Sequence, residues 1–274
     1  MRIDGCQYLP NNGGGNATFK VALVSFLFGP DVKRNLSAIA DAVKSAREKG
    51  CKLICFPECA LTGLPKASSP KDYESDIKLA VEIPGDITDK IGRLARTAEL
   101  YIAIGLLEKS QGKLYDTAVL FNDKGEIILK YRRINPQWHS QNVPKNLYSD
   151  GTSLSTSSTP FGKIAFAICG DIFDNKVVKM IKKAKPDYLI VPMSRSFNSN
   201  YDQDKWEREE KWAYAQQIAK IGVTSLLVNA FQPPDKGASF GGSLIVSPDG
   251  KIIAETAIGR PSTLICELPI CKSR

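Results

Sequence analysis

The sequence predicts an α/β protein with a single layered domain, in which two mixed β-sheets face each other and helices lie outside. Short apolar runs rich in Val, Ile and Leu alternate with amphipathic segments, which is typical of strand–helix–strand units with parallel strands. Two turn sequences further along join neighbouring strands as antiparallel hairpins, so the pairing in each sheet is mixed. The 274 residues, of which 43% are apolar, are enough for one large core.

The chain begins with a predicted loose tail, residues 1–18, whose second half is rich in Asn and Gly. The domain proper, residues 19–274, opens with a strand of Val, Leu and Phe at 19–28. From Asp31 onward apolar residues recur at helical spacing, and a second buried strand follows at 51–56. A strand, a helix and a strand in this order predict a parallel pair.

The remaining elements follow the same signals of apolar period and turn residues. The polar stretches 61–84 and 136–158 are predicted as loops, and loops of such length in a compact domain are often functional. Helices are predicted at 87–100, 177–184 and 204–221, and strands at 101–107, 114–121, 126–131, 163–169, 188–191, 223–228, 242–247, 251–254 and 264–268.

Charge and composition argue against two classes of protein. The net charge is +8, but the basic residues are scattered rather than gathered in a stripe with aromatic residues, so no nucleic-acid partner is expected. No apolar run approaches the roughly 18 residues of a membrane span, and no basic and apolar leader opens the sequence. We therefore expect a cytoplasmic protein that does not bind a membrane.

The cysteines favour reduced thiols over a disulfide framework, because their number, seven, is odd and the chain is large. Three of them, Cys51, Cys55 and Cys59, lack the spacing of a zinc knuckle. The only histidine, His139, lies elsewhere in the sequence. No metal site is expected.

Polar residues stand where three predicted strands end, and together they could carry nucleophilic catalysis. Cys169 ends an apolar strand that Gly170 breaks, a position where a thiol can be exposed and electrostatically activated. Glu58 follows a second strand, and Arg132 and Arg133 follow a third. A buried carboxylate could take the thiol's proton, while an arginine and the Gly170 N–H could hold an anionic intermediate. On spacing alone, a structural cysteine and solvated charged side chains remain the alternatives.

Four short motifs surround these positions and the last hairpin. In their order and spacing they resemble the motifs of the nitrilase superfamily of carbon–nitrogen hydrolases, from about residue 20 to the end. The motifs are Phe56-Pro57-Glu58 with Leu61-Thr62-Gly63, Lys130-Tyr131-Arg132-Arg133-Ile134-Asn135, Ile168-Cys169-Gly170-Asp171-Ile172, and Phe240-Gly241-Gly242-Ser243 followed by Ser247-Pro248-Asp249-Gly250.

The resemblance implies a four-layer αββα sandwich and thiol-dependent hydrolysis of a carbon–nitrogen bond. Cys169 would attack a non-peptide linear amide, or as a second choice a nitrile, and form an acyl-enzyme. Glu58 would be the general base and then the acid, and the backbone N–H of Gly170 would hold the oxyanion. No metal or organic cofactor would be needed. The partners would be a small-molecule amide substrate and a second copy of the chain, in a homodimer or higher homo-oligomer.

The sequence also departs from the pattern of this superfamily. Arg133 stands where the superfamily has its catalytic lysine, and Lys130, three residues earlier on a strand, points to the opposite face. An arginine retains the charge, but its guanidinium is larger, planar and bidentate, so it could hold the oxyanion or instead clamp a carboxylate and crowd the thiol. The superfamily's second glutamate, in the loop before Gly151, has no counterpart. Ser194 and Arg195 are candidates for substrate binding, the arginine for a substrate carboxylate.

Three functions therefore stay open. The first is an amidase-type hydrolase with Arg133 in the role of the lysine. The second is a catalytically silent relative that binds a small molecule or a partner, and the third is an acyltransferase that uses the same cysteine. The first is favoured because Glu58, Cys169 and the turn after Cys169 are all retained.

Overall fold

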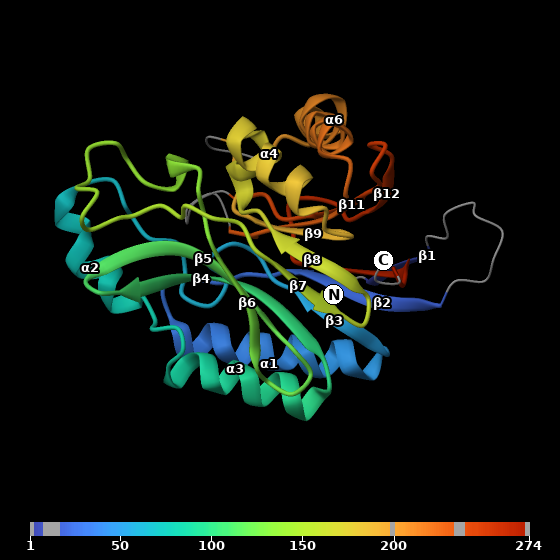
Figure 1. The fold of residues 1–274 in the computed structure, drawn as a ribbon, viewed down its shortest axis with the longest axis horizontal. Coiled ribbons are helices and arrows are strands. Elements are labelled where there is room, and N and C mark those ends of the chain that lie inside the picture. Colours follow the sequence, from blue (N-terminus) through green and yellow to red (C-terminus); the bar gives the residue numbers. More distant parts are fainter. Residues whose placement is uncertain (1–2, 8–16, 198–200, 233–238, 272–274) are drawn as a thin grey trace.

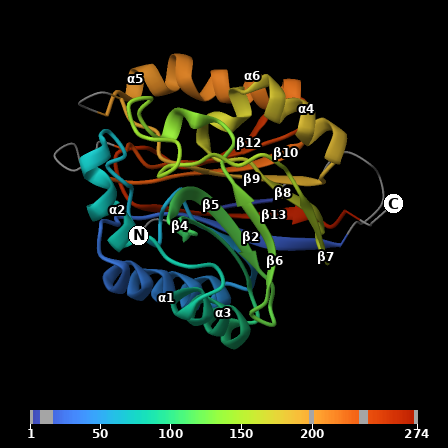
Figure 2. The same ribbon diagram turned by 60° about the vertical axis from the view of Figure 1, so that its left-hand side comes forward.

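Two β-sheets pack face to face between two layers of helices (Figure 1). The computed structural model describes residues 3–7, 17–197, 201–232 and 239–271. Helices α1 (Val32–Glu48) and α3 (Asp86–Ala98) cover the outer face of one sheet, and α4 (Asn175–Ala184) and α6 (Lys211–Ile221) cover the other, as the turned view in Figure 2 also shows. The predicted α/β sandwich of four layers, αββα, is confirmed.

The first sheet has its strands in the order β1-β13-β2-β3-β4-β5-β6. Its centre, β2-β3-β4, is parallel, and β5 and β6 continue it as antiparallel strands. On the other side β13 is antiparallel to β2 and parallel to β1. The strands are β1 (Ile3–Gln7), β2 (Thr18–Ser25), β3 (Cys51–Cys55), β4 (Tyr101–Ser110), β5 (Lys113–Phe121), β6 (Ile127–Arg132) and β13 (Ser262–Pro269).

The second sheet, in the order β12-β11-β10-β9-β8-β7, repeats this plan. Three parallel strands, β8-β9-β10, are followed by two antiparallel ones. Both sheets therefore bring the carboxyl ends of parallel strands to an edge, where α/β proteins place their ligands. The strands are β7 (Thr156–Thr159), β8 (Gly162–Phe166), β9 (Tyr188–Met193), β10 (Thr224–Asn229), β11 (Ser243–Val246) and β12 (Ile252–Glu255).

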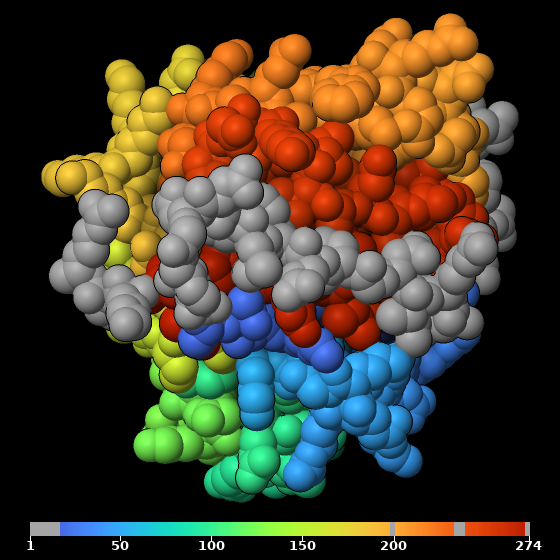
Figure 3. Space-filling model, turned by 90° about the vertical axis from the view of Figure 1, so that its right-hand side faces the viewer, coloured from blue at the N-terminus to red at the C-terminus, as the bar shows by residue number. Residues whose placement is uncertain are grey.

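The chain crosses from the second sheet back to the first at its end. Strand β13 lies beside β2, although β11 and β12 belong to the other sheet. In Figure 3 the C-terminal residues (red) accordingly run between the orange residues of α6 above and the blue residues of the first part of the chain below. This return ties the two sheets together.

Apolar side chains fill the space between the sheets. Leu23, Leu53 and Leu120 of the first sheet belong to one buried cluster with Phe166 and Ile190 of the second. A separate cluster lies between the first sheet and helices α1 and α3. Each fully buried side chain of this size contributes about 1.5–3 kcal/mol to the free energy of unfolding. The strand ends that carry the polar residues therefore project from a well-packed frame.

The predictions for the tail and the cysteines need correction. Strand β1 lies within the expected loose tail 1–18, of which residues 8–16 are outside the described part. It pairs with β13 through its backbone, which needs no long apolar pattern in the sequence. Cys266, expected to be a reduced thiol, is disulfide-bonded, whereas Cys51, Cys55, Cys59, Cys169 and Cys271 are free. Cysteine spacing cannot reveal such a bond, because it depends on how distant strands pair.

Both predicted loops contain an element. Helix α2 (Tyr73–Leu79) lies in the stretch 61–84; it is short and polar, so it lacks the apolar period of the longer helices. Strand β7 begins inside the stretch 136–158, and its Ser and Thr residues sit on a sheet edge without apolar alternation. None of the described helices is long and apolar enough to cross a membrane.

Candidate active site

The three predicted catalytic residues lie together at one end of the sandwich. Glu58 follows β3, Arg133 follows β6, and Cys169 follows β8 of the opposite sheet. All three line a cavity of about 220 Å³. A larger cavity of about 480 Å³ also reaches Arg133 and Cys169.

Glu58 is held in a turn that packs against β4. The backbone N–H of Gly105 donates to the carbonyl of Pro57 over 3.2 Å, and the N–H of Leu61 donates to the carbonyl of Gly105 over 3.2 Å. A Cβ atom on residue 105 would lie 2.7 Å from Cα of Glu58. The approach that buries Glu58 therefore requires a glycine on the neighbouring strand.

Arg133 faces the site because of a β-bulge. The register of β5 and β6 shifts between Leu120 and Phe121, so that the N–H of Arg133 donates to the carbonyl of Asp116 over 2.8 Å. Without that extra residue Asp116 would lie opposite Arg132 instead. The bulge thus decides which of the two arginines enters the site.

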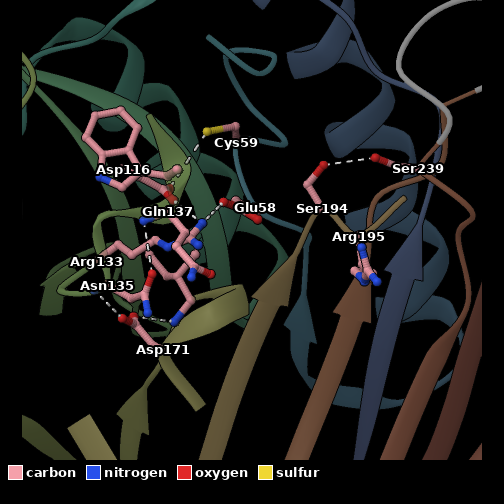
Figure 4. A network of polar contacts seen from close by, with 12 residues as sticks. Glu58, Cys59, Asp116, Arg133, Asn135, Gln137, Asp171, Ser194, Arg195 and Ser239 are labelled. Carbon is pink, nitrogen blue, oxygen red and sulfur yellow. Dashed lines mark hydrogen bonds and ion pairs between the residues drawn. The ribbon is translucent and has the colours of Figure 1, made fainter. Parts of the chain in front are cut away.

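One guanidinium nitrogen contacts two carboxyl groups (Figure 4). Nη1 of Arg133 lies 2.6 Å from Oε1 of Glu58 and 3.5 Å from Oδ2 of Asp116, and none of the three side chains is more than 5% exposed. Burial lowers the pKa of Arg133, but the charges of Glu58, Cys169 and Asp116 together raise it by more. The net shift is upward, so the guanidinium stays charged. Oε2 of Glu58 is buried and has no hydrogen-bond partner among the described residues. One oxygen of Glu58 is therefore fixed while the other is available to accept a proton.

Cys169 occupies a turn with an unusual backbone. Its φ of 47° lies in the left-handed region, which costs a residue other than glycine about 1–3 kcal/mol. It opens a short 3-10 helix, Cys169–Phe173. Such a conformation persists only where the surroundings hold it, and here they place a thiol at the mouth of the cavity.

Asp171 provides that hold. Its carboxylate accepts hydrogen bonds from the backbone N–H of Ile168 (2.9 Å) and of Asn135 (2.8 Å), and from the hydroxyl of Tyr131 (2.7 Å). Burial raises the pKa of Asp171, and these hydrogen bonds oppose the rise. Because Tyr131 and Asn135 flank Arg133, Asp171 fixes the turn of Cys169 relative to the arginine.

The thiol of Cys169 is not activated at rest. Burial raises its pKa to about 12, with a further rise from Glu58, while Arg133 and the backbone N–H of Ser194 lower it. The pKa is raised rather than lowered because desolvation outweighs an arginine whose charge is already shared with Glu58. If this sulfur attacks a substrate, a neighbouring base must take its proton.

Gly170 makes room for the arginine. A Cβ atom on this residue would lie 3.1 Å from Nη2 of Arg133. The second guanidinium nitrogen thus approaches the turn that also carries the N–H of Gly170, the predicted oxyanion donor.

The candidates for substrate binding follow β9. The hydroxyl of Ser194 is hydrogen-bonded to that of Ser239 (2.9 Å), and its backbone N–H faces Cys169. Arg195 lines the larger cavity, pairs with Glu210 at 2.9 Å, and lies apart from the group around Arg133 (Figure 4). Burial lowers the pKa of Arg195, but the hydrogen bond to Glu210 opposes this, and the pKa is raised overall. The arginine is charged and partly exposed, at 39%.

Sequence reasoning missed Asp116 as a site residue. It supplies a second buried carboxyl group from β5, whereas the carboxylate in the loop before Gly151, Asp150, is only half-buried. A charged residue within an apolar strand was the available signal. The prediction that Lys130 points away is confirmed, since its Nζ lies 3.0 Å from Oε1 of Glu108. No group of three or more possible metal ligands occurs in the part of the chain that the structure describes.

Comparison with known proteins shows the family of this chain. Residues 20–270 match the model of the carbon–nitrogen hydrolase family. Omega-amidase NIT2 of Xenopus tropicalis is 28% identical over 260 residues, covering 91% of this chain and 87% of that protein. The human omega-amidase NIT2 is 25% identical over 248 residues, covering 87% of this chain and 84% of that protein.

Solved structures share the fold. An amidase from Nesterenkonia sp. has a TM-score of 0.72 and 19% identity, covering 92% of this chain and 90% of that one. The glutamine-dependent NAD+ synthetase of Acinetobacter baumannii has a TM-score of 0.77 and 19% identity, covering 94% of this chain and 48% of that one. With a family match over nearly its whole length, the chain belongs to the carbon–nitrogen hydrolase family of the nitrilase superfamily and is an enzyme of that class.

Proposed function

We propose that this enzyme hydrolyses a small linear amide that carries a carboxylate, through an acyl-enzyme on Cys169. The observation that carries the proposal is the convergence of Glu58, Arg133 and Cys169 on one cavity, where Oε2 of Glu58 has no hydrogen-bond partner within the described part of the chain. The structurally similar Nesterenkonia amidase supports a cysteine nucleophile, since in a glutamate-to-glutamine mutant of that enzyme the acetamide moiety of fluoroacetamide adds covalently at the active-site cysteine.

Acylation would proceed in two steps. Sγ of Cys169 attacks the amide carbon while Glu58 accepts the thiol proton, and the carbonyl oxygen becomes an oxyanion. Arg133 and the N–H of Gly170 stabilise that charge. The intermediate then collapses, the carbon–nitrogen bond breaks, and Glu58 returns its proton to the departing ammonia.

Deacylation would use the same groups in reverse. Glu58 removes a proton from a water molecule, whose oxygen attacks the thioester carbon. The carbon–sulfur bond breaks, the carboxylic acid leaves, and the proton returns to the sulfur of Cys169. Because burial raises the pKa of the Cys169 thiol, the sulfur needs Glu58 to take its proton in each cycle.

Arg195 supports the choice of a substrate with a carboxylate. It lines the larger cavity together with Cys169 and retains its charge beside Glu210. Guanidinium and carboxylate groups match in geometry and form charge-assisted hydrogen bonds. The omega-amidase relatives favour a terminal amide as the reacting group.

The test is ammonia release from two matched substrate sets. One set contains monoamides of short linear dicarboxylic acids, and the other the corresponding uncharged alkyl amides. We expect Arg195→Gln to raise KM for the charged set by about tenfold and to leave the uncharged set unaffected. The solvent-exposed Arg208, changed to Gln, is the control.

Two results would contradict the proposal. Ammonia release that persists in the variant Cys169→Ala would remove the acyl-enzyme. An Arg195→Gln variant that treats both substrate sets as the wild type does would remove the carboxylate site while leaving amide hydrolysis intact.

A further inference from the structure

The active site holds a second carboxylic acid with few stabilising partners. Oδ1 of Asp116 accepts a weak hydrogen bond from Sγ of Cys59 at 3.8 Å, and Oδ2 makes the long contact of 3.5 Å with Arg133. The Asp116 side chain is 1% exposed. The carboxyl groups of Asp116 and Glu58 both contact the same guanidinium nitrogen, Nη1 of Arg133, and therefore lie close to each other.

The charges of this group do not balance if both acids are ionised. Arg133 is the only cationic residue among those that line the smaller cavity, whereas Glu58 and Asp116 both line it. Two carboxylates beside one buried guanidinium leave a net negative charge, which burial disfavours strongly. A single proton shared between the two acids removes that charge.

The contacts indicate which acid holds the proton. Glu58 has the short ion pair of 2.6 Å, which favours its ionised form. Asp171, the next carboxylate, accepts from three backbone N–H groups and a tyrosine hydroxyl. The hydrogen bonds that Asp116 makes to the Cys59 thiol and to Arg133 are both long, at 3.8 and 3.5 Å.

Burial and the charged groups around Asp116 together set the pKa of its carboxyl group. Burial raises the pKa of Asp116 well above its usual value, and the charges of Glu58 and Asp171 raise it further, while Arg133 opposes them. The neighbouring thiols, Cys59 and Cys169, have raised pKa values and stay neutral.

We propose that Asp116 is a positioning residue that stays protonated in the working enzyme and donates its O–H to Glu58. The inference rests on the proposed function of Glu58 as the base. A neutral Asp116 leaves Glu58 ionised and the charge of Arg133 available to the oxyanion. When Asp116 loses its proton at higher pH, a second negative charge faces Cys169 and competes for Arg133. Activity then falls.

Two variants separate this role from a merely structural one. Asparagine has the shape of aspartic acid and is neutral at every pH. We expect Asp116→Asn to keep kcat/KM within about fivefold of the wild type and to lose the alkaline decline that Asp116 causes. Asp116→Ala, which removes the donor, should lower kcat by about 10². An Asn variant as damaged as the Ala variant would overturn the proposal.

A measurement on the wild type needs neither activity nor a stable variant. Isotope-edited infrared spectroscopy with labelled aspartate detects the carbonyl band of a protonated acid. We expect one such band at neutral pH that disappears on alkaline titration. Its absence at neutral pH would refute the inference even if the enzyme hydrolyses amides. Its presence without amide hydrolysis would contradict the proposed function instead.

Discussion

Nη1 of Arg133 lies 2.6 Å from Oε1 of Glu58, and each side chain is 5% exposed. The residue expected to hold an oxyanion is therefore also the ion-pair partner of Glu58, the proposed base. The guanidinium can serve both because its nitrogens point in fixed, different directions: Nη1 toward the acids and Nη2 toward Gly170. A lysine would place one compact charge in that space.

Loss of Arg133 should therefore impair catalysis more than a remote charge would. We expect Arg133→Ala to lower kcat/KM by about 10² or more, because the oxyanion loses its charged donor and Glu58 its partner. Arg133→Lys, which restores a charge, should fall between this variant and the wild type. Arg132→Ala is the matched control, since Arg132 binds Glu108 on the opposite face. Equal kcat/KM losses in the two alanine variants would contradict the assignment.

Gly170 and Arg133 should behave as a coupled pair. A Cβ at residue 170 would lie 3.1 Å from Nη2, and the backbone there suits any residue, so only space is at issue. We expect Gly170→Ala to lower kcat by about tenfold in the wild type, by shifting the guanidinium. The same change should cost much less in the Arg133→Lys background. A double-mutant cycle on kcat measures the coupling, and additive losses would show that the two residues are independent.

Removal of the Glu58 charge should affect two assays in opposite directions. Burial and the Glu58 carboxylate raise the pKa of the Cys169 thiol to about 12, while Arg133 lowers it. In Glu58→Gln the carboxylate is gone and Arg133 loses its short ion pair, so the pKa of Cys169 falls and the thiolate fraction at neutral pH rises. Alkylation of Cys169 by iodoacetamide, followed by peptide mass spectrometry, should become faster, whereas amide hydrolysis should stop. The free cysteines Cys51 and Cys55 are internal controls, and slower alkylation of Cys169 would refute the argument.

Several features of the site follow from short-range patterns that a sequence displays. Glu58 and Cys169 stand directly after apolar runs, so their places at strand ends could be predicted. The alternation of faces along β6 also separates Lys130 from Arg133 correctly. Arg133 therefore was assigned to the site although it departs from the family's usual residue.

Other features depend on pairing that no local pattern encodes. Asp116 faces Arg133 only because a bulge at Leu120 shifts the register by one residue. The raised pKa of Cys169 depends on the burial that the opposite sheet imposes. Ser194 lowers the pKa of Cys169 through its backbone N–H, and a contact made by the backbone cannot be predicted from the type of side chain.

The outer face of the first sheet offers a prediction on stability. Glu108, 1% exposed, accepts two hydrogen bonds from Arg132 (2.6 and 2.8 Å), one from Lys130 (3.0 Å) and one from Thr117 (2.9 Å). Burial raises the pKa of Glu108, but the hydrogen bonds from Arg132, Lys130 and Thr117 together lower it by more. The pKa of Glu108 therefore lies below the usual value.

The folded protein stabilises the ionised form of Glu108. The contribution of Glu108 to the free energy of unfolding is therefore complete above the usual glutamate pKa and is lost as the pH falls through the lower pKa of the folded state. We expect Glu108→Gln to reduce the free energy of unfolding by about 2 kcal/mol at neutral pH, as loss of charged hydrogen bonds does. Below about pH 4 the difference from the wild type should shrink, because protonated Glu108 resembles the amide. Urea unfolding at both pH values measures this, with Glu99→Gln, at an exposed position, as control. A difference that stays constant on acidification would show that Glu108 stabilises the sheet by packing rather than by charge.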